Sequence, residues 1–413
     1  MIVGRSIYWF RHDLRLLDNP QFLKACERSD TLLPVFIVPE HTQTRWGFER
    51  YSAKRFAFLN ECVHALAEQL HERGSSLLVV QGDPVQKLSE LVHQHAITTI
   101  YCETIAAPEE QAQIDALMNL GISVDTAWQS SMIDPSALGF AMTDLPDVFT
   151  AFRKEVERRS LRFTTPLPAP TSIPPSPSPS ISTVLEVDSD SLFVPGGEQH
   201  GLQHVKGYFA QRLADTYKQT RNQLSGFNAS SKFSPWLATG ALSARTIMAH
   251  LDAYEQQFGA NEGTYWLWFE LLWRDYFRFL SLKYGKRLFC GKGLSHKSPF
   301  TYDPLRFEQW RTGTTGIDLI DAGMRELHAT GYLSNRMRQI VASHWIYTMS
   351  GNWQAGAAWF ETCLLDYDVY SNQGNWLYIA GHGTDPRGGR AFNVQKQILE
   401  YDPQGSYRQQ WLP

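Results

Sequence analysis

The sequence predicts an α/β N-terminal domain with a doubly wound parallel sheet, followed by an all-α C-terminal domain. Short β-branched apolar runs alternate with helix-like segments up to about residue 130, whereas from Gly196 onward apolar residues recur at helical spacing. A stretch rich in proline and serine separates these two patterns. A chain of 413 residues, of which 43% are hydrophobic, is long enough for two domains with their own cores.

The N-terminal domain, residues 1–130, contains five apolar segments that we expect to be strands. They are Ser6–Phe10, Leu32–Val38, Leu77–Val80, Thr99–Cys102 and Val124–Trp128, with helices expected at Pro20–Arg28, Tyr51–Arg73, Pro84–His95 and Glu109–Leu120. Near-continuous apolar strands that alternate with helices are typical of a parallel sheet buried on both faces. No Gly-x-Gly-x-x-Gly motif follows the first strand, so we do not expect a dinucleotide bound in the Rossmann manner.

Residues 131–199 are predicted to connect the two domains. Their central part, residues 164–183, is rich in proline and serine and cannot bury enough apolar area to offset the entropy lost on ordering. We therefore expect a long surface linker at the domain boundary. The helical domain, residues 200–413, contains ten of the 13 tryptophans. This density indicates stacking on planar ligands or electron transfer, although any single tryptophan is more often a core residue.

Charge and composition set limits on the class of protein. The net charge is −4, but from His200 onward 22 Lys and Arg residues stand against 17 Asp and Glu, so the second half is basic. Nucleic acid can bind to such a half if its cations share one face, although charge differences of this size are also common without a function. The five cysteines are scattered, odd in number and without metal-ligand spacing, so we expect reduced thiols and no metal. Because there is neither a long apolar run nor a leader at Met1, we expect a soluble, cytoplasmic protein that does not contact membranes. We also expect the protein to be a monomer.

Residues 331–381 carry the densest set of polar and aromatic side chains. Asn335, Arg338 and Gln339 fall on neighbouring turns of one predicted helix. Asp366 and Asp368 follow a second apolar helix and precede a turn-like Ser-Asn-Gln-Gly-Asn run. The helix dipole disfavours acids at a C-terminus, so both should have partners, and Arg338 is the nearest candidate in sequence. A buried Asp–Arg pair between two helices is the alternative, but the polar and tryptophan content favours a binding site.

Two further segments contain candidate binding residues. The first combines three hydroxyls with a cation ahead of a helix whose first turn carries a proline, which is typical of a phosphate site; its residues are Ser230, Ser231, Lys232, Phe233 and Ser234. Helix capping by one serine is the alternative interpretation. In the second segment Glu270 and Arg274 are four residues apart and could pair with each other on one helix.

The run LLDYDVYSNQGNWLYIAGHGTDPRGGRAFNVQKQILEYDPQGSYRQQWLP resembles the flavin-binding region of the photolyase/cryptochrome family, and within it the cryptochrome DASH branch. Related stretches occur in the family's order over most of the chain. They are WFRHDLRLLD, GGEQHGLQHVKGYF, SSKFSPWLATGALS, ELLWRDYFRF and TGYLSNRMRQ.

The resemblance implies an FAD cofactor and, beside it, an antenna chromophore such as methenyltetrahydrofolate. The implied FAD contacts are Tyr217, Ser230, Ser231, Lys232, Phe233, Ser234, Arg274, Asn335, Arg338, Asp366, Asp368 and Asn372. In this assignment Asn335 faces flavin N5, and an amide suits a reduced anionic flavin because an acid there would repel it. The implied antenna contacts are Glu103, Glu109 and Glu110; alternatively these three are solvated acids in a loop and a first helical turn.

The resemblance also implies light-driven repair of cyclobutane pyrimidine dimers in DNA by electron transfer from reduced FAD. Glu270, Trp273 and Asn335 would be catalytic, and Arg221, Arg336, Gln339, Tyr378 and Arg390 would contact DNA, although Arg336 and Arg390 could equally be ordinary surface arginines. Tyr378 stands where duplex-repairing relatives have a second tryptophan, and Gln339 stands where they have methionine. A smaller, more polar wall should hold a flipped dimer less tightly, so we expect a preference for single-stranded DNA.

Electron supply in the resembled family runs along three tryptophans. Trp376 and Trp353 match the first two, but the third position falls on Phe300, which is far harder to oxidise, and Tyr302 is a candidate substitute. A blue-light receptor that signals without repair, and a flavoprotein of thermal electron transfer, remain alternatives. The end of the chain at Pro413 disfavours signalling through a tail. Repair of (6-4) lesions is set aside, because neither Asn335 nor Gln339 can act as a general acid.

Overall fold

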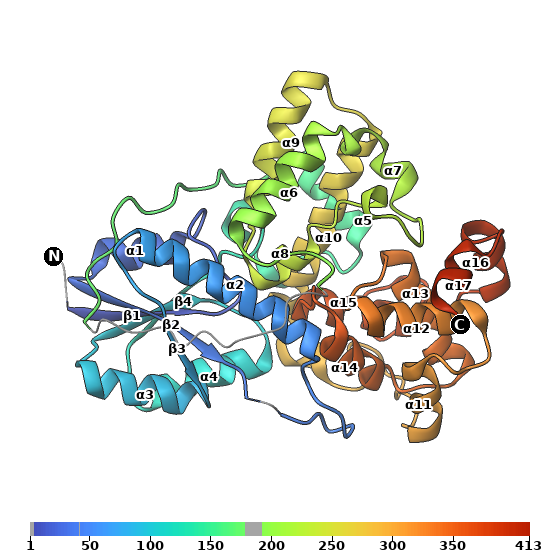
Figure 1. Cartoon of the computed structure of the whole chain (residues 1–413), viewed down its shortest axis with the longest axis horizontal. Coiled ribbons are helices and arrows are strands. Elements are labelled where there is room, and N and C mark those ends of the chain that lie inside the picture. Colours follow the sequence, from blue (N-terminus) through green and yellow to red (C-terminus); the bar gives the residue numbers. More distant parts are fainter. Residues whose placement is uncertain (1–3, 41, 178–191) are drawn as a thin grey trace.

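The computed structural model describes residues 4–40, 42–177 and 192–413 and consists of a sheet-containing part and a helical part (Figure 1). Five parallel strands form one sheet in the order β3-β2-β1-β4-β5. Their bounds are Arg5–Phe10 (β1), Thr31–Val38 (β2), Leu78–Gln81 (β3), Thr99–Glu103 (β4) and Val124–Ala127 (β5). The predicted fold class is confirmed, and the strand order places the topological switch point between β1 and β4.

Four helices cover the two faces of the sheet, with α1 and α2 on one face and α3 and α4 on the other (Figure 1). Their bounds are Pro20–Arg28 (α1), Ala53–Glu72 (α2), Pro84–His95 (α3) and Pro108–Asn119 (α4). The side chains of Asn19, Ser52 and Asp83 accept backbone N–H groups at the starts of α1, α2 and α3. Ile7 and Trp9 of β1 pack on one face, while Tyr8 and Phe10 join a core that continues into the helical part.

The helical part surrounds one long central helix, α10 (Glu262–Tyr284), which begins with a capping box between Asn261 and Thr264. The other helices are α5 (Phe149–Arg158), α6 (Glu198–Ala210), α7 (Tyr217–Thr220), α8 (Ser234–Thr239), α9 (Ala244–Phe258), α11 (Pro304–Thr312), α12 (Asp318–Thr330), α13 (Asn335–Ser343), α14 (Trp353–Cys363), α15 (Val369–Ala380), α16 (Val394–Tyr401) and α17 (Ser406–Trp411). Within the described parts of the chain, none of the helices is both long and apolar enough to cross a bilayer.

The segment predicted as a linker contains α5, followed by extended chain that lies against the sheet-containing part. The backbone N–H of Asp18 donates to the Leu167 carbonyl, and that of Leu32 donates to the Pro175 carbonyl. Residues 178–183 of the predicted Pro/Ser-rich stretch, and Met1, where no leader is expected, lie outside the described residues.

The predicted turn at residues 371–375 is wrong, because this run lies inside α15. Asp368 occupies the N-cap position of α15, and its carboxylate accepts the backbone N–H of Ser371 at 2.7 Å. An aspartate at this position satisfies an otherwise unpaired donor of the first turn, so the polar run starts a helix rather than a turn. Asp368 therefore marks a helix start as well as a candidate ligand contact.

Candidate functional site

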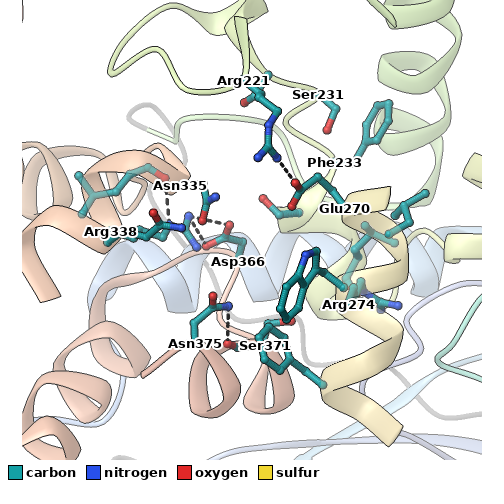
Figure 2. Close-up of a pocket in the computed structure, with 18 of the residues that line it drawn as sticks. Arg221, Ser231, Phe233, Glu270, Arg274, Asn335, Arg338, Asp366, Ser371 and Asn375 are labelled. Atoms are coloured by element: carbon teal, nitrogen blue, oxygen red, sulfur yellow. Dashed lines mark hydrogen bonds and ion pairs between the residues drawn. The ribbon is translucent and has the colours of Figure 1, made fainter. Parts of the chain in front are cut away.

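A cavity of about 440 Å³ opens between α10, α13, α15 and the segment that leads into α8 (Figure 2). Most of the predicted cofactor and nucleic-acid residues line it. They are Tyr217, Arg221, Ser230, Ser231, Lys232, Phe233, Ser234, Glu270, Trp273, Arg274, Asn335, Arg338, Gln339, Asp366, Tyr378 and Arg390. An adjoining cavity of about 80 Å³ shares Asn335, Arg338 and Asp366 as walls and adds Asp368, Asn372 and Trp376. The fold therefore gathers residues between Tyr217 and Arg390, which lie 173 positions apart in sequence, into one region.

The predicted partnership of Asp366 and Arg338 is present in the structure. Arg338 Nη2 lies 2.7 Å and 2.9 Å from the two carboxylate oxygens of Asp366, whose side chain is only 1% exposed. Arg338 Nε also donates to the Leu333 carbonyl at 2.9 Å, which fixes the guanidinium at the start of α13. Figure 2 shows Arg338 and Asp366 together with Asn335 on the same wall. This wall therefore combines an ion pair between Arg338 and Asp366 with the amide of Asn335.

Asp368 has a partner that the sequence did not reveal. Arg278 of α10 approaches it with both terminal nitrogens, Nη1 at 3.2 Å and Nη2 at 2.5 Å, and both side chains are buried. Burial alone would raise the pKa of the Asp368 carboxyl, but Arg278, Arg274 and the hydrogen bonds from Ser371 hold it well below its usual value. The ion pair joins α10 to the start of α15 at the smaller cavity.

The segment Ser230–Ser234 forms a polar wall with a buried cation. Lys232 has a left-handed backbone (φ 54°), and its ammonium donates to Ser230 Oγ at 2.8 Å. Burial lowers the pKa of the Lys232 ammonium to about 8. The N-cap position of α8 is held by Phe233, so the alternative in which a serine caps this helix is wrong. The Ser230 hydroxyl therefore holds the Lys232 ammonium, while Ser231 and Ser234 line the same cavity.

Glu270 does not pair with Arg274, as one interpretation of the sequence had it. Glu270 instead forms an ion pair with Arg221, which comes from the C-terminal end of α7 and lies over the Trp266 ring (Figure 2). Arg274 donates to the carbonyls of Ser130 at 2.6 Å and Leu237 at 3.2 Å. Helical spacing permitted the local pair, but tertiary contacts supplied each residue with a different partner.

Trp273 is held between aromatic neighbours. Its ring stacks on Phe149 with centroids 3.7 Å apart and an interplanar angle of 12°, and Tyr378 meets it edge-on at 5.6 Å. Arg390 Nη2 donates to the Tyr378 hydroxyl at 2.8 Å and to Asp385 at 2.9 Å. This packing holds the indole in one orientation at the cavity wall.

Arg336 is the one predicted nucleic-acid residue among the described residues that does not line the two cavities. Its guanidinium donates to Gln339 at 3.3 Å and to Asn222 at 3.2 Å, and it lies 4.9 Å from the centre of the Tyr401 ring. The sequence reasoning missed Arg278 and, among the residues that line the cavities, Tyr332, Ser371, Asn375 and Phe392. Only Arg278 gave a signal, because it follows Arg274 by four residues on the same helical face.

The two predicted electron-transfer tryptophans are both buried, Trp353 at the start of α14 and Trp376 within α15. Trp376 lines the smaller cavity and meets Phe360 edge-on at 5.1 Å. Trp353 donates its Nε1 hydrogen to the Gly291 carbonyl at 2.9 Å. Phe300 is 47% exposed, and its carbonyl accepts the amide of Asn352, the neighbour of Trp353, at 2.8 Å. Tyr302 lies 4.7 Å from the ring of Trp46 in the sheet-containing part.

The three predicted antenna acids divide into two environments. Glu109 and Glu110 both border two cavities, one of about 580 Å³ against α14 and one of about 380 Å³ at the carboxyl ends of β1 and β2, and Glu109 pairs with Arg50 at 2.7 Å. Glu103 is the last residue of β4, is only 1% exposed and lines neither of these cavities. The interpretation of Glu103 as a solvated acid is therefore wrong, because β4 ends beneath the helical part.

Comparisons with known proteins agree with this geometry. A model of DNA photolyase matches residues 6–172, and a model of the FAD binding domain of DNA photolyase matches residues 266–413. A cryptochrome DASH of Synechocystis sp. is 42% identical over 426 residues, covering 98% of this chain and 87% of the relative. The crystal structure of a Synechocystis sp. cryptochrome matches with a TM-score of 0.93 and 41% identity, over 100% of this chain and 89% of that one.

A third relative is more distant in sequence. The crystal structure of an archaeal photolyase from Sulfolobus tokodaii with two FAD molecules has a TM-score of 0.80 and 27% identity, over 99% of this chain and 90% of that one. The family models, the nearly full-length similarity and the residues gathered in the cavity agree with one another. The chain belongs to the photolyase/cryptochrome family, in its cryptochrome DASH branch, and contains the family's FAD-binding domain.

Proposed function

We propose that this protein is a blue-light-dependent lyase that repairs cyclobutane pyrimidine dimers and prefers single-stranded DNA. The observation that supports this most is the division of one cavity region into two chemically different walls. Asn335, Arg338 and Asp366 form a polar wall with its charges paired, and Glu270 and Trp273 form a wall that combines a carboxylate with an aromatic face. Such a pair of walls suits a planar cofactor beside planar bases.

The residues present fit FAD at both of its ends. A diphosphate would find hydroxyls at Ser230 and Ser231 and a cation at Lys232. The charge of the buried Lys232 ammonium is favoured by the acids Glu326 and Asp366 and opposed by Arg338. The amides of Asn335 and Asn372 and the paired acids Asp366 and Asp368 offer donors and acceptors to the edges of an isoalloxazine ring. When bound and reduced, the flavin would supply on illumination the electron that splits a cyclobutane ring and would then take it back.

The second wall would bind the lesion. Glu270 would hydrogen-bond the pyrimidine bases, and Trp273 would stack on them, with Phe149 holding the indole from behind. The Arg221–Glu270 ion pair would have to open, so that Arg221 turns to a phosphate while Glu270 turns to a base. Because Tyr378 and Gln339 make this wall small and polar, the energy needed to flip a dimer out of a duplex would be poorly offset.

The arginines around the cavity would bind the phosphate backbone. Arg221 and Arg390 line the cavity, and Arg336 lies beside it at the start of α13. In the described structure Arg390 already pairs with Asp385, so this carboxylate would orient the guanidinium rather than leave it free. Their contribution would weaken as the salt concentration rises, because phosphate contacts release counterions.

Electrons would reach the flavin through Trp376 and Trp353, and the outer end of this path would differ from that of relatives with a third tryptophan. Phe300 occupies the third position and is exposed, but it resists oxidation. Tyr302, which packs on Trp46, is the substitute we propose. An antenna such as methenyltetrahydrofolate would lie in the cavities bordered by Glu109 and Glu110, and the two FAD molecules of the Sulfolobus tokodaii photolyase support the presence of a second chromophore.

The decisive experiment measures blue-light repair of one defined thymine dimer in single-stranded and in duplex oligonucleotides, after the absorption spectrum of the purified protein has been recorded. We expect a flavin spectrum and faster repair of the single strand. Equal rates would contradict the strand preference. Light-dependent changes in the flavin without repair of either substrate would favour the second candidate, a blue-light receptor, which the cryptochrome names of the similar proteins also support.

A Trp376→Phe variant separates dimer repair by the reduced flavin from the light-driven reduction of the flavin. We expect it to repair the dimer when a chemical reductant is supplied and to lose most activity when light alone must reduce the flavin. Normal photoreduction by this variant would show that electrons do not pass through Trp376.

FAD affinity should depend on Lys232. Lys232→Met removes a charge-assisted contact worth about 1.5–3 kcal/mol, so we expect FAD to bind roughly 10- to 150-fold more weakly. In the free protein, burial lowers the pKa of Lys232 to about 8, whereas a diphosphate favours the charged form. Above about pH 8, FAD binding therefore requires Lys232 to take up a proton. The Kd of the wild type for FAD should rise there by up to roughly tenfold for each unit of increasing pH.

Equilibrium dialysis of FAD across this pH range measures both effects. The control is Lys218→Met, because Lys218 pairs with Glu262 and does not line the cavity. A wild-type affinity that stays constant from neutral to alkaline pH would show that Lys232 does not contact the diphosphate.

A further inference from the structure

A small cavity lies at the seam between the sheet-containing part and the helical part. Its volume is about 10 Å³, which is enough for one water molecule. Its walls come from the end of β4, the segment after β5, α10, α15 and the turn between α8 and α9. The residues that line it include Glu103, Ser130, Arg274, Arg278, Gly240 and Tyr370.

Three of the residues that line this space each have a buried polar atom without a hydrogen-bond partner in the described part of the chain. Glu103 Oε2, Ser130 Oγ and Arg278 Nε are all buried and have no hydrogen-bond partner within the described part of the chain. Roughly 90% or more of buried polar groups in folded proteins have a partner, so three unpaired atoms around one space are unusual. Glu103 and Arg278 are 1% and 2% exposed, so bulk solvent does not satisfy them.

A single water molecule has the hydrogen-bonding capacity that these atoms need. It can accept the Arg278 Nε hydrogen, exchange a hydrogen bond with the Ser130 hydroxyl and bond to the Glu103 carboxyl. We propose that Glu103, Ser130 and Arg278 hold one buried water molecule, and that this water connects the Glu103 carboxyl to the Arg278–Asp368 ion pair.

This connection reaches the candidate flavin cavity. The two terminal nitrogens of Arg278 hold the Asp368 carboxylate, while its third nitrogen, Nε, is buried without a partner among the described residues, and Arg278 lines the same space as Glu103. Asp368 lines the smaller cavity and caps α15. Glu103 is therefore a positioning residue that acts through Arg278, and only this last step rests on the proposed flavin.

The protonation of Glu103 should be visible in the stability of the protein. Burial raises the pKa of Glu103 to about 8. The ionisable groups around it are Tyr8, Arg11, His12, Asp13, Arg15, Cys102, Arg274, Arg278 and Tyr370. The folded state holds the Glu103 proton more tightly than the unfolded chain does. The stabilisation that this proton gives is therefore complete below the unfolded pKa of about 4.3. Between that pH and about pH 8 the folding equilibrium constant falls by up to roughly tenfold per pH unit, and above about pH 8 this group causes no further change.

The test uses the protein without added flavin, together with Glu103→Gln, Glu103→Leu and Ser130→Ala variants. High-resolution crystal structures should show one water within hydrogen-bond distance of all three atoms in the wild type and the glutamine variant, and none in the leucine variant. A dry space, a side chain that fills it or a chloride ion in place of water would overturn the proposal. If the leucine variant fails to fold, Ser130→Ala serves instead, and the water should then keep only two partners.

Thermal unfolding between about pH 5 and about pH 8 provides the second readout, because a merely structural Glu103 would not change its slope. The wild type should lose stability across this interval more steeply than Glu103→Gln, and parallel curves would overturn the role of the Glu103 proton. With FAD bound, the flavin absorption of the wild type should shift through about pH 8, whereas that of Glu103→Gln should not. A protein that refuses FAD would refute the proposed function but leave the water site to be decided by the crystal structures.

Discussion

Replacing Arg278 by leucine is expected to lower the free energy of unfolding by about 3–5 kcal/mol, because it leaves the Asp368 carboxylate buried and unpaired. Arg278 holds this carboxylate with two hydrogen bonds, and both side chains lie inside the protein where water cannot replace the lost partner. Denaturant unfolding followed by circular dichroism measures the change. Wild-type stability in Arg278→Leu would show that Asp368 is protonated or hydrated in the native state.

The matched control is Lys24→Leu, which removes a cation from a solvent-exposed pair. Lys24 and Asp125 lie 2.7 Å apart with side chains 45% and 35% exposed, so we expect a loss of at most about 1 kcal/mol. A second check is pH. Because the pKa of Asp368 is depressed in the folded state, its stabilising effect is present above about pH 3.9, the unfolded value, and is lost as the pH falls further. The difference between wild type and Arg278→Leu should therefore narrow in acid.

This ion pair also marks where prediction from sequence stopped. Helices and strands follow from local patterns such as apolar runs and caps at Asn19, Ser52 and Asp83, so the parallel sheet and its covering helices were predicted to within a few residues. The Arg338–Asp366 pair was also predicted, because Arg338 was the nearest candidate partner in sequence. The Arg278–Asp368 pair joins residues 90 positions apart, and no local spacing connects Arg278 to Asp368.

The errors in the sequence analysis have the same physical origin. The run at residues 371–375 has the composition of a turn, but a cap from Asp368 starts a helix there. Glu270 and Arg274 have the spacing of a helical ion pair, but Glu270 pairs instead with Arg221 at the end of α7. Glu103 was interpreted as an antenna contact or, alternatively, as a solvated acid, and the second interpretation failed because the helical part closes over the end of β4. In each case tertiary packing supplied a partner or a cover that sequence distance concealed.

The second large effect concerns substrate binding. Trp273→Ala is expected to weaken binding of a single-stranded oligonucleotide that contains a thymine dimer by about 1–3 kcal/mol, or roughly 5- to 150-fold, because it removes one base-stacking surface. Fluorescence anisotropy in the dark measures this affinity without repair. Trp46→Ala is the control, since Trp46 lies outside the 440 Å³ cavity and packs on Tyr302.

The comparison between damaged and undamaged strands decides what Trp273 recognises. If Trp273 stacks on a flipped dimer, Trp273→Ala should reduce the affinity for the dimer-containing strand much more than that for the undamaged one. Phe149 extends the test, because it stacks on Trp273 at 3.7 Å and does not line the cavity. Phe149→Leu should therefore weaken dimer binding by less than Trp273→Ala while leaving the undamaged strand unaffected. Equal losses on both strands would mean that the indole stacks on any base, and the specificity for the dimer would then have to come from Glu270.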